Sequence, residues 1–288
     1  MPLWFFVSDL HGRLSRYAAL FAAIDAERPD AVFLGGDLMP SGLHTLTDGE
    51  DTPDDFVGEV LAAGFRRVRE RRGSASPEVV LILGNDDARV EETALGEGEQ
   101  DGLWRYAHNR RLTVGDRSVY GYNCVPPTPF RLKDWERYDV SRFVDVGCVS
   151  PEEGWRSVPV AENEVRYGTI AADLDALAGE DDLSAAVLLF HSPPYQCRLD
   201  RAALDGRMVD HAPLDVHVGS IAIRRFIEKR RPALALHGHV HESARLTGAW
   251  RDRIGPTHLF SAAHDGPELA LVRFDPDQPE AARRELVG

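Results

Sequence analysis

The sequence contains few cysteines and no long hydrophobic run, and each scarcity excludes a class of protein. Its three cysteines, Cys124, Cys148 and Cys197, show no C-x-x-C spacing, so neither a disulfide framework nor a zinc ribbon is expected. No apolar run approaches the roughly 20 residues that a membrane-spanning helix needs. The run at residues 3–7 is too short for the core of a signal peptide and has no basic segment before it. We therefore expect a cytoplasmic protein without a membrane partner.

Positive charge is also scarce. The chain has 33 Lys and Arg against 47 Asp and Glu, which gives a net charge of −14. An acidic surface repels the phosphate backbone, so a nucleic-acid partner is not expected. The 288 residues are 43% hydrophobic, which supplies a large core and excludes a disordered chain. No repeat or linker divides the sequence, and we expect one domain over residues 1–288.

Short apolar runs alternate with segments of helical periodicity in the first third of the chain. Each apolar run predicts a buried strand, and each segment with apolar residues three and four positions apart predicts a helix. This alternation favours stacked sheets covered by helices. The expected strands are residues 3–8, 31–35 and 78–83, the expected helices are residues 13–28 and 54–72, and residues 36–51 are expected to form a loop.

The middle of the chain breaks this rhythm. The pattern at residues 111–122 predicts a hairpin. Residues 124–166 contain five prolines and no clear periodicity, and so long a loop region in a compact chain is typical of a functional surface. We interpret residues 124–166 as an irregular insertion that forms a lid. Regular pattern then resumes, with helices expected at residues 169–177 and 219–231 and strands at residues 185–190, 233–236, 258–262 and 268–274.

Polar residues with ligand chemistry follow five of the expected strands. Because ligands bind at the strand ends of open α/β sheets, side chains from five strands can meet in one place. The sequence holds 11 His and 25 Gly, so a G-H-x-H match is expected only about 0.04 times by chance. The five segments are Asp9-Leu10-His11, Gly36-Asp37, Gly84-Asn85-Asp86-Asp87, His191-Ser192-Pro193-Pro194 and His237-Gly238-His239-Val240-His241.

Together these motifs resemble the calcineurin-like metallophosphoesterase superfamily, and residues 191–194 and 237–243 resemble its prokaryotic phosphodiesterase-type branch. The resemblance implies an α/β fold in which two stacked mixed β-sheets are flanked by helices, a four-layer sandwich. It also implies a dinuclear metal-dependent phosphoesterase, and more specifically a phosphodiesterase. In such an enzyme a metal-bridging hydroxide attacks phosphorus in line.

The motifs supply donors that suit divalent transition metals. Carboxylate oxygens and imidazole nitrogens bind Mn²⁺, Fe or Zn²⁺. Residues i and i+2 of an extended chain face the same side, which places Asp9 beside His11 and His239 beside His241. The resemblance implies two metal ions that share Asp37 as a bridging ligand. By this resemblance Asp9, His11, Asp37 and His241 hold the first ion, and Asp37, Asn85, His191 and His239 hold the second.

One position departs from the superfamily pattern. A histidine that assists the leaving group usually follows the motif asparagine, but this chain has Asp86 there. An ionised carboxylate cannot donate a proton, so substrates with good leaving groups are favoured. His217 is a candidate replacement, and the neighbouring Asp87 is expected to support the ligands. The residues to which we assign catalytic roles are Asp37, Asn85, His239 and His217.

Three residues outside the ligand set are candidate substrate contacts. Arg13 opens the first helix and is placed to meet a phosphate, whereas Asn123 and Tyr195 border the irregular region and are placed to contact a base or ring. The expected partner is a small phosphoester, nucleotides included, and a homo-oligomer stays open. Two alternatives stay open as well: a non-catalytic interaction scaffold of the same fold, and a nuclease of the same superfamily. The net charge of −14 argues against the nuclease.

Overall fold

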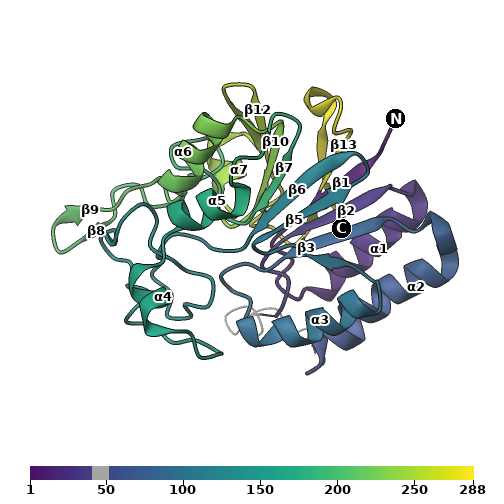
Figure 1. Cartoon of the computed structure of the whole chain (residues 1–288), viewed down its shortest axis with the longest axis horizontal. Helices are drawn as coiled ribbons and strands as arrows, with labels where there is room; N and C mark the ends of the chain where they lie inside the picture. Colours follow the sequence, from purple (N-terminus) through teal and green to yellow (C-terminus); the bar gives the residue numbers. More distant parts are fainter. Residues whose placement is uncertain (41–51) are drawn as a thin grey trace.

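The computed structural model describes residues 1–40 and 52–288, and two six-stranded mixed sheets form its centre (Figure 1). In the first sheet β1 to β4 run parallel, and β13 pairs antiparallel with both of its neighbours. Across this sheet the strands are β14 (Arg283–Val287), β13 (Leu269–Phe274), β1 (Trp4–Val7), β2 (Ala31–Gly35), β3 (Glu78–Ile82) and β4 (Arg105–Tyr106).

The second sheet has four parallel strands at its centre and an antiparallel strand at each edge. Across it the strands are β11 (Arg251–Ile254), β12 (Thr257–Ser261), β10 (Leu234–His237), β7 (Val187–Phe190), β6 (Arg117–Tyr122) and β5 (Arg110–Val114). Both sheets are therefore mixed, as the sequence analysis predicts.

Helices cover the outer faces of the two sheets. Figure 1 shows α1, α2 and α3 beside the first sheet, and α5 and α6 beside the second. The sandwich thus has four layers, helix–sheet–sheet–helix, which confirms the predicted fold class. On the first sheet the helices are α1 (Leu14–Glu27), the π-helical η1 (Val57–Ala62), α2 (Ala63–Arg72) and α3 (Glu92–Gln100), and on the second they are α5 (Ile170–Ala178) and α6 (Ile221–Arg230).

An apolar core fills the space between the sheets. Phe6 and Phe33 of the first sheet and Leu189 and Phe260 of the second are fully buried in one apolar cluster. The ring of Phe260 meets that of Phe274 edge-on, with centroids 5.7 Å apart, and so joins the two sheets. Strands buried on both faces carry apolar residues at nearly every position, which explains why they are readable as continuous apolar runs.

The segment that was predicted to be irregular contains one helix. Residues 124–166 hold isolated β-bridges, and α4 (Glu162–Tyr167) begins near their end. The side chains of Lys133 and Glu136 form a fully buried ion pair at 2.5 Å, and Trp135 is 1% exposed. Trp135 belongs to the same apolar cluster as residues of both sheets, so residues 124–166 are packed onto the sandwich. A two-stranded hairpin, β8 (Met208–Val209) and β9 (Ala212–Pro213), follows later in the chain.

The predicted strands and helices match the structure to within a few residues at their ends. The predicted loop at residues 36–51 is described as far as residue 40, and residues 41–51 lie outside the described residues. Within the described ranges, no helix has the length and apolar character that crossing a membrane requires. The elements that the sequence analysis did not predict are α3, α4, β4, β8, β9, β11, β14, α7 (Ser243–Thr247), η2 (Gly73–Ala75), η3 (Arg89–Glu91) and η4 (Pro279–Ala281).

Candidate metal centre

Strands from both sheets end at one edge of the sandwich. The backbone N–H of Asp9 donates to the carbonyl of Gly36 at 2.9 Å and joins the ends of β1 and β2. The backbone N–H of Gly238 donates to the carbonyl of His191 at 2.9 Å and joins the ends of β10 and β7. The motifs thus meet where the strand-end rule places a ligand site. The residues that follow the strands are Asp9 after β1, Asp37 after β2, Asn85 after β3, His191 after β7 and His239 after β10.

Several of these residues have a left-handed backbone. The φ angles are 58° for Asp9, 49° for His11, 52° for Asp37 and 74° for His239. Such conformations are uncommon for residues other than glycine and cluster at functional sites. The prediction that Asp9 and His11 meet on an extended strand is therefore wrong, because a tight turn brings them together.

The first donor cluster combines two carboxylates with two imidazoles. Its members are Asp9, His11, Asp37 and His241, whose ligand atoms all lie within 4.8 Å of one another. His241 Nε2 is 3.0 Å from His11 Nε2 and 3.2 Å from Asp9 Oδ1. His11 Nε2 is 3.9 Å from Asp37 Oδ2. This convergence of oxygen and nitrogen donors is the arrangement that a divalent transition metal requires.

The second cluster shares Asp37 with the first. Its other members are His191 and His239, and His191 Nε2 lies 3.2 Å from Asp37 Oδ2. The opposite ring nitrogen, His191 Nδ1, is 2.7 Å from the carbonyl of Gly35. Since a carbonyl only accepts, Nδ1 carries a proton, and Nε2 is the ring nitrogen that faces Asp37 and is left to bind an ion. His239 and His241 therefore belong to different clusters, whereas the extended-chain argument paired them.

Asn85 lies beside the second cluster. The backbone N–H of its neighbour Asp86 donates to Asp37 Oδ1 at 2.9 Å. Asn85 is 4% exposed, and its Oδ1 has no hydrogen-bond partner among the described residues; the same holds for the buried Oδ2 of Asp9. Buried acceptors without a donor are rare in folded proteins and indicate a missing ligand. The donors present therefore fit two metal ions.

The charges at the centre favour a bound cation. Burial raises the pKa of Asp9, but the hydrogen bond and charge of His241 outweigh burial and lower that pKa to about 2. Burial likewise opposes ionisation of Asp37, yet the neighbouring His191 and His11 hold its pKa well below the ordinary value. Burial lowers the pKa of His191, but Asp37 raises it to about 10. Two buried anions thus depend on a positive neighbour, a part that a metal ion can take.

Similarity to known proteins identifies the family of this chain. The family model described as calcineurin-like phosphoesterase matches residues 4–243, which include every motif named above. The chain belongs to the calcineurin-like phosphoesterase family. Membership in this family implies a phosphoester hydrolase, and the two Asp/His clusters are its candidate metal site. A search of curated proteins finds no match.

Solved structures agree on the fold of this calcineurin-like phosphoesterase. TT1561 of Thermus thermophilus is 18% identical with a TM-score of 0.61, covering 100% of this chain and 99% of that one. A second structure is 16% identical with a TM-score of 0.57 and full coverage of both chains. At these identities the likeness concerns the fold alone.

Asp86 takes the position of the superfamily histidine. Its Oδ2 lies 3.7 Å from His11 Nδ1, so the side chain borders the first cluster. Burial and the negative charge of Asp37 raise the pKa of Asp86 to about 7. A bound cation acts in the opposite direction, because it stabilises the ionised carboxylate. Asp86 is therefore placed at the centre, but with a chemistry different from that of the histidine it replaces.

Asp87 supports the loops that carry the candidate ligands. Its fully buried carboxylate accepts the backbone N–H groups of Leu38 at 2.9 Å, Met39 at 2.8 Å and Gly84 at 2.9 Å. These groups flank Asp37 and Asn85, so one side chain holds the ends of β2 and β3 together. The structure thus agrees with the supporting role expected from the sequence.

Arg16 supports the first motif in a similar way, and the sequence analysis missed it. This arginine is 4% exposed and donates to the carbonyl of Asp9 and, at 2.5 Å, to that of Gly266. It therefore fixes the turn after β1 to the loop before β13. Its signal in the sequence was an arginine among the buried positions of α1, where an unpaired charge would be costly.

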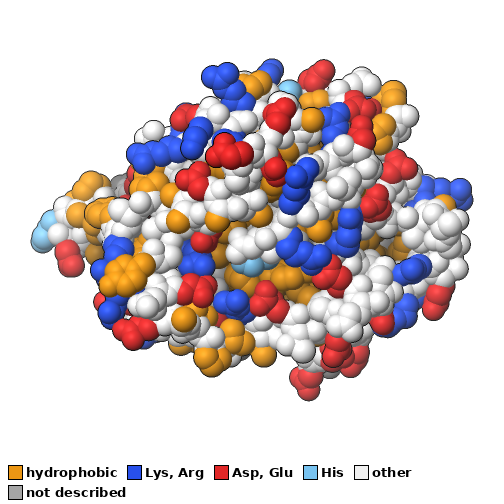
Figure 2. All heavy atoms as spheres, viewed as in Figure 1, with side chains coloured by type: hydrophobic (Ala, Val, Ile, Leu, Met, Phe, Trp, Pro, Cys, Tyr) orange, Lys and Arg blue, Asp and Glu red, His pale blue; other side chains and the backbone are white. Residues whose placement is uncertain are grey.

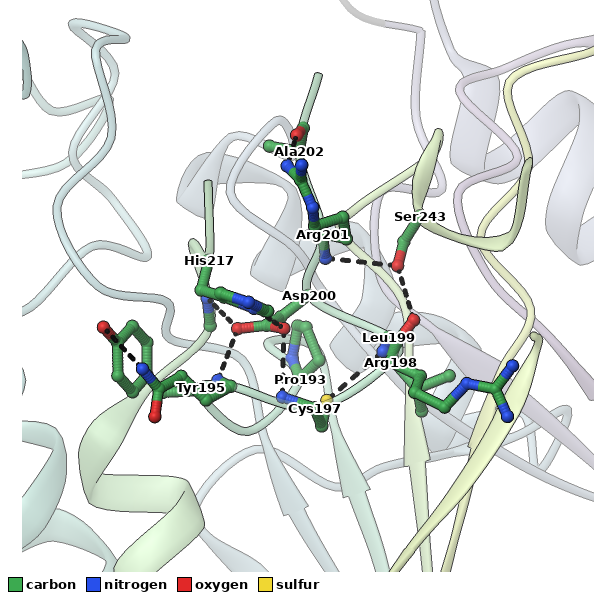
Figure 3. Close-up of polar contacts among 12 residues, drawn as sticks. Pro193, Tyr195, Cys197, Arg198, Leu199, Asp200, Arg201, Ala202, His217 and Ser243 are labelled. Carbon is green, nitrogen blue, oxygen red and sulfur yellow. Dashed lines mark hydrogen bonds and ion pairs between the residues drawn. The ribbon is translucent and has the colours of Figure 1, made fainter. Parts of the chain in front are cut away.

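His217 forms a pair with a buried aspartate. Figure 3 shows the His217 ring beside the Asp200 carboxylate, and His217 Nδ1 lies 2.8 Å from Asp200 Oδ1. Asp200 is fully buried. The carboxylate also accepts the backbone N–H groups of Gln196 at 2.8 Å and Cys197 at 3.1 Å. His217 Nδ1 therefore carries the proton, and Nε2 is the nitrogen left for other partners. The ring centroids of His217 and Tyr195 lie 6.1 Å apart.

The three candidate substrate contacts differ from one another in burial and in hydrogen-bond partners. Arg13 stands at the start of α1, and its guanidinium donates to the carbonyl of Gly266 at 3.5 Å. Tyr195 is half-buried, and its hydroxyl donates to Asp215 at 2.6 Å. Asn123 is fully buried. The side chain of Asn123 accepts from the backbone of Leu83 at 3.1 Å and donates to the Tyr106 hydroxyl at 2.8 Å. Asn123 therefore braces the sheets, and the expectation that it contacts substrate is corrected.

Proposed function

We propose that this chain is a dinuclear phosphodiesterase that acts on small phosphoesters, nucleotides included. One observation carries the proposal: two separate donor clusters share the carboxylate of Asp37. A shared carboxylate would suit a pair of cations, because its negative charge would stabilise both of them. When bound, two such ions, Mn, Fe or Zn, supply charge that activates a water and offsets the charge developing on phosphorus oxygens.

The protein's own contribution is to hold the donors in place before an ion binds. Asp9, Asp37 and His191 are buried in a rigid edge formed by five strand ends. Burial excludes bulk water and strengthens every charge interaction at the reacting phosphate. Asn85 and His239 complete the second cluster on this proposal, with His239 neutral because burial lowers its pKa to about 3. A neutral imidazole is the form that binds a metal.

The preference for diesters rests on Asp86. With a carboxylate where relatives have histidine, the centre supplies no proton donor at that position once Asp86 is ionised. We therefore propose that the enzyme favours substrates whose leaving group needs little protonation. A diester also brings one negative charge fewer than a monoester dianion, so its repulsion by Asp86 is smaller.

We assign proton transfer to the leaving group to His217. The buried Asp200 orients its ring and leaves His217 Nε2 as the exchanging nitrogen. The test compares His217→Asn with the natural protein on diesters of p-nitrophenol and of a simple alcohol. The proposal expects a small loss with p-nitrophenol and at least tenfold more with the alcohol. Equal losses for both leaving groups would leave His217 with a structural role only.

Arg13 and Tyr195 remain proposed substrate contacts. A small substrate accords with the surface, because the face shown in Figure 2 mixes acidic and basic side chains and carries no continuous basic stripe. A cytoplasmic location also remains a proposal, with Cys124, Cys148 and Cys197 all free.

Hydrolysis of bis-p-nitrophenyl phosphate tests the proposed function. The protein is stripped with a chelator and then supplied with Mn²⁺, Fe²⁺ or Zn²⁺. We expect no hydrolysis without metal and restored hydrolysis with at least one ion. Asp37→Ala should abolish the restored activity, whereas Asp116→Ala should keep it, because the Asp116 side chain is 86% exposed and lies outside both clusters. Hydrolysis that is indifferent to metal would contradict the proposal.

A further inference from the structure

A polar cavity separate from the metal centre lies between residues 124–166 and the strand ends of the sheets. Its volume is about 110 Å³, and it is lined by Arg89 and His108 from the sandwich and by Trp135, Arg137 and Arg156 from the insertion. At about 30 Å³ per water molecule, this volume holds several waters or one tetrahedral oxyanion. None of the donors that form the metal centre lines it.

The acidic side chains of this cavity are already engaged. Four basic and three acidic residues line the cavity. Glu136 pairs with Lys133 at 2.5 Å, and Glu164 pairs with Arg137 at 2.9 Å. The third acid, Asp134, accepts the backbone N–H of Arg89 at 2.8 Å and both polar groups of Ser157.

Arg156 is the lining cation that takes part in none of these pairs. Within residues 1–40 and 52–288 its guanidinium forms no hydrogen bond or ion pair, although the side chain is only half-exposed. Two of the other lining cations have further carboxylate partners, because Arg89 pairs with Glu92 at 3.0 Å and Arg137 also pairs with Asp173 at 2.8 Å. The lining as a whole is therefore not positive, and what Arg156 offers a ligand is a set of unused hydrogen-bond donors. A guanidinium without a carboxylate partner is the group that binds planar or tetrahedral oxyanions most strongly.

Trp135 adds a second, independent observation. The side chain is 1% exposed, and its indole N–H has no acceptor in the described part of the chain. The guanidinium of Arg89 lies over the same ring, 5.4 Å from its centroid. A buried donor without an acceptor indicates a missing ligand. The indole of Trp135 and the guanidinium of Arg156 can only donate hydrogen bonds. The complementary ligand is an acceptor with several oxygens, such as a phosphate group.

The cavity is also close to the metal centre. Arg89 lies four residues beyond Asn85, and four residues of extended chain span no more than about 14 Å. The carboxylate of Asp134 in the insertion binds the backbone of Arg89, so the insertion is docked on the loop that carries Asn85. This separation is within the length of one molecule of nucleotide size.

We propose that this cavity is an oxyanion subsite that binds a second phosphate group of the substrate, with Arg156 and Trp135 as its specificity-determining residues. The substrate class is then a phosphodiester that carries a further phosphate, rather than a diester with uncharged ends. This inference rests on the proposed function for the reacting phosphate. The cavity itself is tested without the metal centre.

The first experiment titrates inorganic phosphate into chelator-stripped protein and follows binding by calorimetry. We expect one bound phosphate per chain, at least tenfold weaker binding for Arg156→Met, partial recovery for Arg156→Lys, and several-fold weaker binding for Trp135→Phe. Arg131→Met is the matched control, because this exposed arginine lies in the same insertion but does not line the cavity. Absence of phosphate binding, or equal affinity in Arg156→Met, would overturn the site.

The second experiment separates a substrate phosphate from free phosphate. Dithymidylate with a free 5′-hydroxyl and its 5′-phosphorylated form compete with bis-p-nitrophenyl phosphate in metal-loaded protein. We expect the phosphorylated form to inhibit at least tenfold better in the natural protein, with the advantage lost in Arg156→Met and kept in Arg131→Met. Equal inhibition in the natural protein would overturn the substrate assignment. Absence of any hydrolysis would instead defeat the proposed function, while the titration still decides the cavity.

Discussion

Replacement of Asp87 tests how the fold supports the centre. Its buried carboxylate accepts three backbone N–H groups, from Leu38, Met39 and Gly84. Each buried donor that loses its acceptor costs about 1 to 3 kcal/mol, so Asp87→Ala should lower the free energy of unfolding by at least about 3 kcal/mol. For a domain of this size, that corresponds to a fall in Tm of roughly 6 to 12 °C.

Asp87→Asn should show a graded effect. The amide keeps one acceptor oxygen for Leu38 and Met39 and loses only the bond to Gly84. We expect about a third of the loss that Asp87→Ala causes. Thermal unfolding is measured near pH 8.5, above the pKa of about 7 that burial and Asp37 give to the Asp87 carboxyl. Asp116→Ala, at a side chain that is 86% exposed, should leave Tm unchanged.

Metal content is the second readout for Asp87. Since the three bonds position the loops that carry Asp37 and Asn85, metal affinity should fall about 10- to 100-fold in Asp87→Ala. The reasoning is refuted if Asp87→Ala unfolds within 2 °C of the natural protein, a margin of roughly 1 kcal/mol or less. It is also refuted if that variant retains its metal at the natural affinity.

Three further predictions concern other supporting residues. Burial lowers the pKa of His108 to about 3, so between pH 6.5 and 5 only the unfolded chain takes up a proton at this histidine. The free energy of unfolding should therefore fall by at most about 2 kcal/mol from pH 6.5 to pH 5. Urea unfolding of His108→Gln should lack this pH dependence, and an unchanged dependence would contradict the prediction. Arg16→Met removes the donor to the carbonyls of Asp9 and Gly266, so Tm and metal occupancy should both fall, unless the turn holds itself without Arg16. On α3, a Cβ added at Gly98 would overlap Trp104, whereas a Cβ at Gly96 would meet open space. Gly98→Ala should therefore lower the free energy of unfolding, and Gly96→Ala should raise it by up to about 1 kcal/mol. Urea unfolding of both variants checks this, and two changes of the same sign would contradict the packing described for α3.

The strand ends were predictable because two simple rules coincide there. Buried parallel strands give continuous apolar runs, and polar residues that interrupt such runs mark the ends. The sequence alone therefore predicts that Asp37 and His191 lie at one edge of the sandwich. The sharing of Asp37 between the clusters came from the resemblance to a family, not from spacing, since the sequence pattern says nothing of the distances between strands.

The turns at the site could not be read from the sequence. Asp9 and His239 occupy left-handed conformations that tertiary contacts impose, and local pattern favours an extended chain instead. Asn123 was misassigned for a related reason: its place at a strand end was correct, but its side chain bonds Leu83 and Tyr106 across the sheets. Which of several strand-end polar groups faces a ligand is decided by packing.

The missed elements share weak local signals. The helix α3 contains Gly96 and Gly98, which lower helix propensity, and its packing against Trp104 is what stabilises it. The strand β14 pairs with β13 at an edge of the first sheet and has mainly charged, exposed residues. Both elements depend on neighbours that are distant in sequence, so hydrophobic periodicity did not reveal them.

The number of metal ions bound per chain tests the central claim most directly. The protein is saturated with Mn²⁺ or Zn²⁺, freed of excess ion, and analysed by mass spectrometry of the metal. The account predicts two ions per chain, and at most one in Asp37→Ala, because both clusters depend on that carboxylate. A single ion or none in the natural protein would contradict the account.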